Sequence, residues 1–211
     1  MRSATEARMA TGAAPPATRS GKGLERLLLA LIVILVCAGL WQAGSGAWIH
    51  LKARLAQVLM AQAWARTLAG SAAASPWPWA DTWPVARLRV PRLDVELYVL
   101  AGASGRTLAF GPGHLHGTAA PGTAGNSVIS AHRDTHFAFL RDLRPGDELI
   151  LETPDGSVSH YTVDETQVVD RDAMEVLEGN EAPRLTLVTC YPFDALRPNS
   201  PLRYVVGARG I

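Results

Sequence analysis

The sequence contains very little cysteine. Only two of its 211 residues are cysteines, Cys37 and Cys190. Cys37 lies inside a long apolar run and is expected in lipid or in a removed segment, so Cys190 has no partner and an intrachain disulfide is excluded for the rest of the chain. A lone thiol outside the cytoplasm is a candidate nucleophile, and the alternative is a small buried apolar side chain. Sequence position alone favours neither interpretation.

The sequence also lacks an excess of charge of either sign. It has 20 Lys and Arg against 19 Asp and Glu, which gives a formal net charge of +1. Proteins that bind nucleic acids neutralise phosphates with dense groups of basic residues, and no such group occurs beyond the N-terminus. We therefore expect no nucleic-acid partner.

Internal repeats, coiled-coil heptads and long amphipathic helices are missing from residues 83–211. Short apolar or alternating segments are instead separated by turns rich in Gly, Pro and Asp, a pattern typical of an all-β barrel or sandwich. The predicted strands are 85–90, 95–100, 126–131, 148–151, 158–163, 166–169, 185–189 and 204–208. We expect a long loop over 110–125 and a short helix over 172–177.

The N-terminal part predicts a membrane anchor. Residues 1–23 are polar and without apolar periodicity, as in a disordered cytoplasmic tail. The run 27–49 contains no Asp, Glu, Lys or Arg, and at about 1.5 Å per residue it can cross a bilayer core of about 30 Å. We place the transmembrane anchor at 24–49, with the remainder exported because basic residues precede the run. The alternative is a cleaved signal peptide, processed among the small residues 43–47.

Two further regions follow the anchor. Residues 50–82 predict a helical stalk and a linker: residues up to 69 are mostly good helix formers, and 70–83 are rich in Ala, Ser, Pro and Trp. Residues 83–211 are numerous enough to form a domain with its own core.

Three strand ends carry the residues most suited to catalysis. The strand 185–189 ends at Cys190, and Arg203 opens the strand 204–208 after a proline-containing loop. If these strands pair antiparallel, Cys190 and Arg203 become neighbours, and a nearby positive charge favours the nucleophilic thiolate. A cysteine nucleophile also needs a proton partner. His132 is the best candidate because it terminates a buried strand, so we predict that the three residues meet at one rim.

These residues resemble those of the sortases, a family of membrane-anchored cysteine transpeptidases. TLVTC at residues 186–190 is similar to the family's active-site signature. SAHRD at residues 130–134 is similar to the segment that carries the family's histidine. The family's arginine opens the strand after the cysteine loop, which corresponds to Arg203. Arg197 is the rival arginine, but it lies among prolines within the loop.

A subgroup is suggested by the segment CYPFDALRPNSPLRYVVGA, residues 190–208. It is similar to sortases of Gram-negative bacteria. Ala131 departs from the pattern, because many relatives have glycine before the histidine, but the three catalytic candidates are unaffected.

The resemblance implies an eight-stranded β-barrel with short helices, preceded by a transmembrane helix and a stalk, and with the site at one rim. It implies a cysteine that attacks a C-terminal sorting motif such as LPXTG, a thioacyl-enzyme, and transfer to an amine. Histidine acts first as acid and then as base, and arginine stabilises the oxyanion or positions the peptide. The implied partners are the sorting-signal peptide of an exported protein and an amine acceptor, and no cofactor is implied. The implied location is the inner membrane, with the catalytic domain in the periplasm.

Three further residues are candidates at the oxyanion or substrate site. Thr189, with the backbone N–H groups after Cys190, is a candidate oxyanion donor. Asp134 is a candidate for orienting His132, although a solvated carboxylate is the simpler interpretation. Arg197 is the third.

Other functions fit parts of the sequence. Zinc sites use spacings like that of His114 and His116, or of His132 and His136. However, the first pair lies in a Gly/Pro loop and the second spacing helps only on a helix, so we expect no metal. A cysteine hydrolase that uses water, and an anchored module that binds extended peptides without cutting them, are the remaining alternatives.

Overall fold

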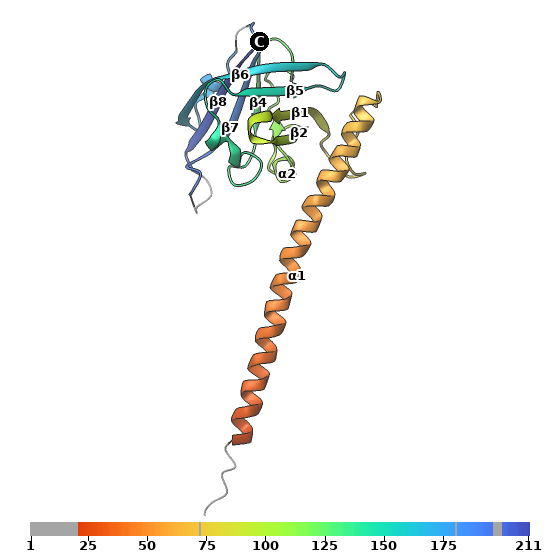
Figure 1. Ribbon diagram of the computed structural model, residues 1–211, viewed down its shortest axis with the longest axis vertical. Coiled ribbons are helices and arrows are strands. Elements are labelled where there is room, and N and C mark those ends of the chain that lie inside the picture. The colour runs from red at the N-terminus through yellow and green to blue at the C-terminus, as the bar shows by residue number, and fades with distance from the viewer. Residues whose placement is uncertain (1–20, 72, 180, 196–199) are drawn as a thin grey trace, which may run out of the picture. The chain divides into compact units, whose positions relative to one another are not determined.

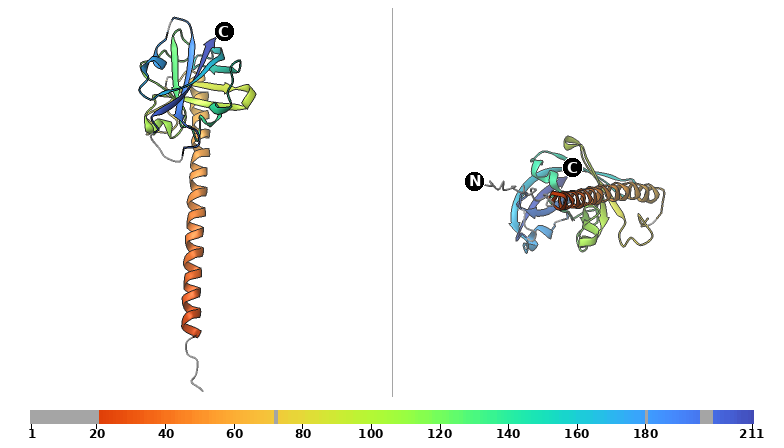
Figure 2. Two further views of the ribbon diagram at one scale, coloured as in Figure 1. Left: turned by 90° about the vertical axis from the view of Figure 1, so that its left-hand side faces the viewer. Right: turned by 90° about the horizontal axis from the view of Figure 1, so that it is seen from below.

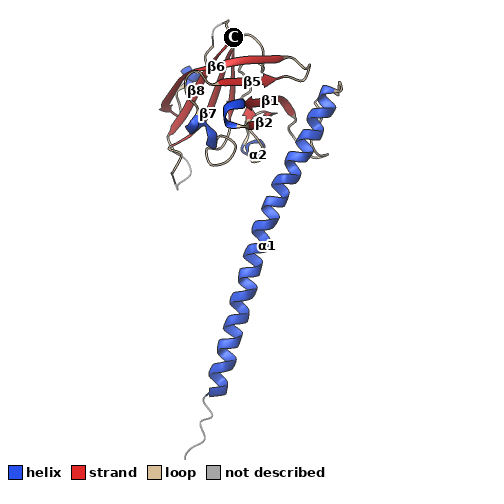
Figure 3. Cartoon of the chain, in the orientation of Figure 1, coloured by secondary structure: helices blue, strands red, loops and turns tan. Residues whose placement is uncertain are grey.

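The computed structural model describes residues 21–71, 73–179, 181–195 and 200–211, except the side chains of 21–22, 43–54 and 174. Its helices are α1 Gly21–Leu68, α2 Gly105–Leu108 and the 3-10 turns η1 Pro91–Leu93, η2 Ala138–Asp142 and η3 Met174–Leu177 (Figures 1 and 3). Its strands are β1 Pro84–Val90, β2 Val95–Ala101, β3 Gly113–His114, β4 Asn126–Ser130, β5 Glu148–Glu152, β6 Val158–Asp170, β7 Arg184–Tyr191 and β8 Leu202–Gly210. The chain forms two compact units, residues 1–50 and 51–211.

Among the described residues of the first unit, one helical segment is long and apolar enough to cross a membrane. This candidate span is Gly23–Gln42, which has a mean hydropathy of 2.3 and is not buried against the rest of the protein. A signal sequence has the same properties, so the segment is compatible with both N-terminal alternatives. α1 continues without a break to Leu68, and the predicted span and stalk are therefore parts of a single helix.

The second unit is built on a closed β-barrel with the strand order β1-β2-β3-β4-β7-β8-β6-β5 (Figures 1 and 2). Neighbouring strands are antiparallel except for β2 with β3 and β4 with β7, which are parallel. The predicted all-β barrel of eight strands is confirmed.

Some local predictions were wrong. The segments 158–163 and 166–169 were expected as separate strands but belong to one strand, β6. A register shift between Val163 and Glu165 lets β6 continue past the charged residues without breaking its pairing with β8. β3 lies inside the region predicted as a loop, and α2 and η2 were not predicted.

Alternation along the strands divides the barrel wall into an inner and an outer face. On β7, Leu185 and Leu187 are fully buried in the core, together with Ile129 of β4 and Val206 of β8. Because side chains alternate along a strand, Val188 and Cys190 point to the opposite, outer face. The outer face of β4, β7, β8 and the end of β6 carries the candidate site.

The last turns of α1 pack against the barrel within the second unit. Met60 is fully buried and forms a small apolar cluster with Leu100 of β2, against which Trp77 and Phe110 also pack. The ring of Trp64 lies 6.4 Å from that of Tyr98. Amphipathic packing of this kind stabilises the helix segment that was predicted as a stalk.

An ion pair between the exposed Arg92 and the buried Asp147 fixes the turn before β5. Both carboxylate oxygens of Asp147 accept hydrogen bonds from Arg92, at 2.5 and 2.6 Å, and one also accepts from the backbone N–H of Arg144 at 2.7 Å. The hydrogen-bonded Arg92 guanidinium holds the pKa of Asp147 below its ordinary value of 3.8. The ionised carboxylate therefore stabilises the folded state.

We predict a pH-dependent loss of stability in the Asp147→Asn variant. The Asp147 carboxylate binds a proton more weakly in the folded protein than in the unfolded chain. Its contribution to the free energy of unfolding is therefore full above the ordinary pKa and disappears as the pH falls through the pKa of the folded state. The free energy of unfolding, measured with urea, should be lower for Asp147→Asn than for wild type near pH 6. The difference should shrink below about pH 3. A difference that stays constant across this range would contradict the prediction.

Candidate active site

β7 delivers Cys190 to the outer face at one rim of the barrel. The strand pairs antiparallel with β8 in a continuous register in which Cys190 is directly opposite Arg203. Residues directly opposite each other in an antiparallel pair have Cβ atoms about 4.5–5.5 Å apart. The strand pairing predicted from the sequence is confirmed, and it places Cys190 and Arg203 directly opposite each other on one face of the barrel. Both residues are half-buried.

The Arg203 guanidinium is held by the loop that it follows. Its Nη1 donates hydrogen bonds to the backbone carbonyls of Ser200, at 2.8 Å, and Leu202, at 2.9 Å. The Ser200 hydroxyl in turn donates to the carbonyl of Tyr191, the residue after the cysteine. A guanidinium has five N–H donors. Two of them orient the group, and three others can serve a substrate oxygen.

β4 brings His132 to the same rim. β4 pairs parallel with β7, and Ser130 is the register partner of Val188. The ladder continues one step further, since the N–H of Ala131 donates to the carbonyl of Val188 at 3.2 Å. Counting on by register, His132 lies beside the strand position of Cys190. Its side chain is exposed.

Two contacts support the loops that follow these residues. Arg133 donates a hydrogen bond from Nη2 to the carbonyl of Ala195 at 2.8 Å, which ties the segment after His132 to the segment after Cys190. Tyr191, Phe193 and Tyr204 pack ring against ring, with centroids 5.2–6.2 Å apart, and Phe193 and Tyr204 also pack on the core. Packing among these three aromatic rings therefore supports the rim.

A groove runs along the outer face next to the thiol. It has a volume of about 190 Å³, several times the roughly 30 Å³ of a water molecule. We define the groove by Ser130, Val169, Val188 and Arg203 of the barrel wall and Val176 and Leu177 of the β6–β7 connection, residues 171–183. Val188 is the residue before Cys190 on this face of β7, and Arg203 is the register partner of Cys190. Because Val188 and Arg203 both line the groove, the groove adjoins Cys190.

A family model described as the sortase domain matches residues 88–211, which is more than half of the 211 residues. The chain belongs to the sortase family. Sortase D of Bacillus subtilis is 34% identical over 120 residues, 56% of this chain and 60% of that protein. Sortase A of Listeria monocytogenes is 30% identical over 110 residues, 50% of this chain and 49% of that protein. This sortase thus spans about half the length of these two relatives.

Solved sortase structures share the barrel. Sortase A from Corynebacterium diphtheriae superposes with a TM-score of 0.57 at 28% identity, covering 63% of each chain. A sortase D5 transpeptidase of Clostridium perfringens gives 0.54 at 28% identity, covering 61% of this chain and 79% of that one. The curated relatives come from Gram-positive bacteria, so the Gram-negative subgroup stays a prediction.

The three secondary candidates are placed differently. The Thr189 hydroxyl is buried and donates a hydrogen bond to the carbonyl of Ala131 at 2.7 Å. We therefore infer that it links β7 to the end of β4 rather than binding an oxyanion. Asp134 is exposed, and no hydrogen bond joins it to His132 in the described part of the chain. Arg197 lies outside the described residues.

Burial affects two further histidines of this sortase, His114 and His136. Nε2 of His114 lies 2.9 Å from the Ala119 carbonyl and 3.1 Å from the Thr118 hydroxyl, and burial lowers the pKa of His114. Burial, followed by the charge of nearby His132, lowers the pKa of His136. Among the residues that the structure describes, no group of three or more His, Cys, Asp or Glu could hold a metal ion.

The sequence did not predict the side-chain contacts that Arg133 and Asn126 make to the loops around the candidate site. Arg133 was noted only as part of the SAHRD segment. Asn126 begins β4 as the strand pattern predicts, and its side-chain amide also bonds to the β6–β7 connection. Asparagine is unfavourable in strands, and that mismatch was the available signal.

We predict that Thr189→Val destabilises the domain. The substitution keeps the shape but removes the hydroxyl, and loss of a buried hydrogen bond costs about 1–3 kcal/mol. The free energy of unfolding in urea should fall by this amount, whereas Thr189→Ser, which keeps the hydroxyl, should lose much less. Equal stability of the valine and serine variants would show that the hydrogen bond contributes nothing.

Proposed function

We propose that this sortase is a cysteine transpeptidase with Cys190 as nucleophile, His132 as general acid and base, and Arg203 as the oxyanion or substrate donor. The observation that carries the proposal is the β7–β8 register, which sets Cys190 opposite Arg203. The parallel pairing of β4 with β7, which brings His132 to the same rim, supports it further.

Acylation begins with attack of the Cys190 thiolate on the carbonyl carbon of the scissile peptide bond. The carbonyl oxygen becomes an oxyanion, and the N–H groups of Arg203 stabilise its negative charge. As the intermediate collapses, the C–N bond breaks and His132 donates a proton to the leaving amine. The product is a thioester between the acyl part of the peptide and Cys190.

Resolution reverses these roles. An incoming amine attacks the thioester carbonyl while His132, now neutral, removes its proton. The C–S bond breaks, the Cys190 sulfur leaves as thiolate, and a new amide bond forms. The enzyme returns to its starting protonation state, so the two half-reactions need no cofactor.

The groove supports a peptide substrate of the sorting-signal type. Val169, Val176, Leu177 and Val188 give it apolar walls, which suit the apolar side chains of a motif such as LPXTG. The acyl part must stay bound between the two half-reactions, so we assign the groove to residues on the N-terminal side of the scissile bond. The acceptor is an amine.

The proposed cellular setting is an inner membrane of the Gram-negative type, with the catalytic domain in the periplasm. The candidate span Gly23–Gln42 and the basic residues Arg19, Lys22 and Arg26 around its start support a retained single-pass anchor. We propose the divisions 1–23 for a cytoplasmic tail, 24–49 for the anchor, 50–82 for stalk and linker, and 83–211 for the catalytic barrel. The segment 190–208 supports the subgroup.

We predict that Cys190→Ala abolishes turnover but not folding or peptide binding. Loss of the nucleophile should lower product formation by about 10⁴-fold or more, whereas Cys190 is half-buried on the outer face and contributes little to the core. Cleavage of a panel of motif-bearing peptides would be followed by mass spectrometry, with fluorescence anisotropy for binding and circular dichroism for fold. Undiminished cleavage by the variant would refute the cysteine mechanism, and wild-type binding without any cleavage would favour the binding-module alternative.

We predict that an amine outcompetes water for the acyl-enzyme. Adding hydroxylamine or triglycine to wild type and peptide should convert most of the product to the hydroxamate or the triglycine amide, distinguished by mass. The same assay with a non-nucleophilic salt at equal ionic strength is the control. Carboxylic acid as the sole product at every amine concentration would identify a cysteine hydrolase instead.

A further inference from the structure

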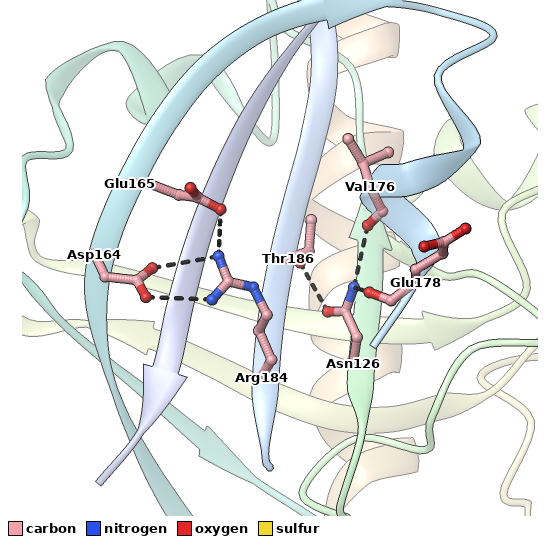
Figure 4. Close-up of polar contacts among 7 residues, drawn as sticks. All are labelled: Asn126, Asp164, Glu165, Val176, Glu178, Arg184 and Thr186. Atoms are coloured by element: carbon pink, nitrogen blue, oxygen red, sulfur yellow. Dashed lines mark hydrogen bonds and ion pairs between the residues drawn. The ribbon is translucent and has the colours of Figure 1, made fainter. Parts of the chain in front are cut away.

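Asn126, at the far end of β4 from His132, holds the β6–β7 connection through its side-chain amide. Nδ2 donates hydrogen bonds to the backbone carbonyls of Val176, at 3.1 Å, and Glu178, at 3.0 Å (Figure 4). Oδ1 accepts a hydrogen bond from the Thr186 hydroxyl of β7 at 2.7 Å. Both partners of Nδ2 are carbonyls, which can only accept, so this amide orientation is the one that satisfies all three bonds.

The Asn126 amide is buried between the barrel wall and the connection. Asn126 is 4% exposed and Thr186 is 3% exposed. The carbonyls at the end of a helical turn lack partners within the turn, and η3 ends at Leu177, between the two carbonyls that Asn126 binds. The amide therefore supplies donors where the connection leaves its 3-10 turn.

Gly179 shows how closely the connection approaches Asn126. A Cβ atom at Gly179 would lie 2.7 Å from both the Cβ and the backbone N of Asn126, closer than real side chains come. This contact requires glycine for steric reasons, independently of the hydrogen bonds. Two separate features thus bring the connection down onto the start of β4.

The residues that Asn126 fixes are those that wall the groove. Val176, whose carbonyl is bound, and Leu177, which follows it, line the groove opposite Val188 and Arg203. Thr186 is four residues before Cys190 on β7, about 13 Å away at about 3.3 Å per residue. At that distance Asn126 does not touch the reacting atoms, and it acts through the wall that it supports.

A second polar group on the same outer face, Arg184 of β7, binds β6, whereas Asn126 binds the connection. Arg184 forms ion pairs with Asp164 at 3.2 Å and with Glu165, the residues at the register shift of β6 (Figure 4). Arg184 is the register partner of Asn126, yet it bonds in the other direction around the barrel. Of these two register partners, Asn126 therefore binds the connection and Arg184 binds β6.

We propose that Asn126 is a positioning residue for the peptide groove, whose amide fixes residues 176–178 so that the groove is formed before substrate binds. The proposal rests on the proposed transpeptidase function for its effect on substrate. Substitution of Asn126 should therefore change the KM for the peptide but leave the reactivity of Cys190 unchanged.

The test compares Asn126→Asp and Gly179→Ala with wild type in the full chain. Asn126→Asp keeps size and shape but loses both Nδ2 donors. Gly179→Ala displaces the connection by a steric clash with Asn126 and leaves the barrel residues unchanged. It therefore still tests the proposal if the buried carboxylate of Asn126→Asp prevents folding. Glu178→Gln is the matched control, because Asn126 binds the backbone carbonyl of Glu178 and its side chain is exposed. Thr186→Ser, which keeps the hydroxyl, should behave as wild type, and Thr186→Val should show a smaller effect of the same kind.

Three readouts separate positioning from general destabilisation: amide hydrogen exchange in residues 171–179, the KM and kcat for peptide, and the rate of Cys190 alkylation by iodoacetamide. We expect faster exchange and a KM raised about five-fold or more in both test variants, with kcat and alkylation within about two-fold of wild type, and no change in Glu178→Gln. Unchanged exchange, or faster exchange with unchanged KM, would overturn the proposal. If wild type cleaves no peptide, the transpeptidase function fails, and exchange alone still decides whether Asn126 fixes the connection.

Discussion

The register between β7 and β8 is the constraint on which the rest of the site depends. The two strands pair without a break from Arg184 opposite Arg209 to Tyr191 opposite Leu202. Because side chains alternate along a strand, slipping the pair by one residue would turn Cys190 towards the core and bring Leu187 to the surface. Burial of the leucines therefore fixes the position of the thiol, and the stability of the core and the geometry of the site have the same cause.

Strand direction explains why three distant residues converge. β4 and β7 are parallel neighbours, so the residues that follow their C-terminal ends, including His132, lie at one rim. β8 is antiparallel to β7, so its first residues, with Arg203, lie at that same rim. Parallel neighbours need a long crossover connection, here made by η2, β5, β6 and η3. The last part of that crossover contributes Val176 and Leu177 to the groove wall.

Local patterns allowed most of the barrel and the strand-end residues to be predicted, because alternation and turn residues act over a few positions. The two-residue strand β3 could not be predicted, since it exists only through pairing with β2 and β4. The continuity of β6 was missed because Asp164 and Glu165 look like a strand break, whereas their charges are balanced by Arg184, about 20 residues away in sequence. Asn126 is a strand residue as predicted, but its side-chain contact was missed because its partners, Val176 and Glu178, are 50 and 52 residues distant. Contacts of this range leave no periodic signal.

The two ends of β4 have different surroundings, because Asn126 bonds to the β6–β7 connection whereas Ser130 lines the groove near the rim. Its first residue bonds to the groove wall, and its last, Ser130, is two residues before His132. An extended strand of five residues spans about 13 Å between its first and last Cα atoms. That distance is too long for either end to disturb the other through direct contact. Backbone hydrogen bonds hold the two ends of the connection, from Arg171 to Pro201 and from Gly210 to Pro183, and the Asn126 side chain binds it between those ends. By the role proposed for Asn126, substrate preference can change through residues near the start of β4, while strand register keeps Cys190 opposite Arg203.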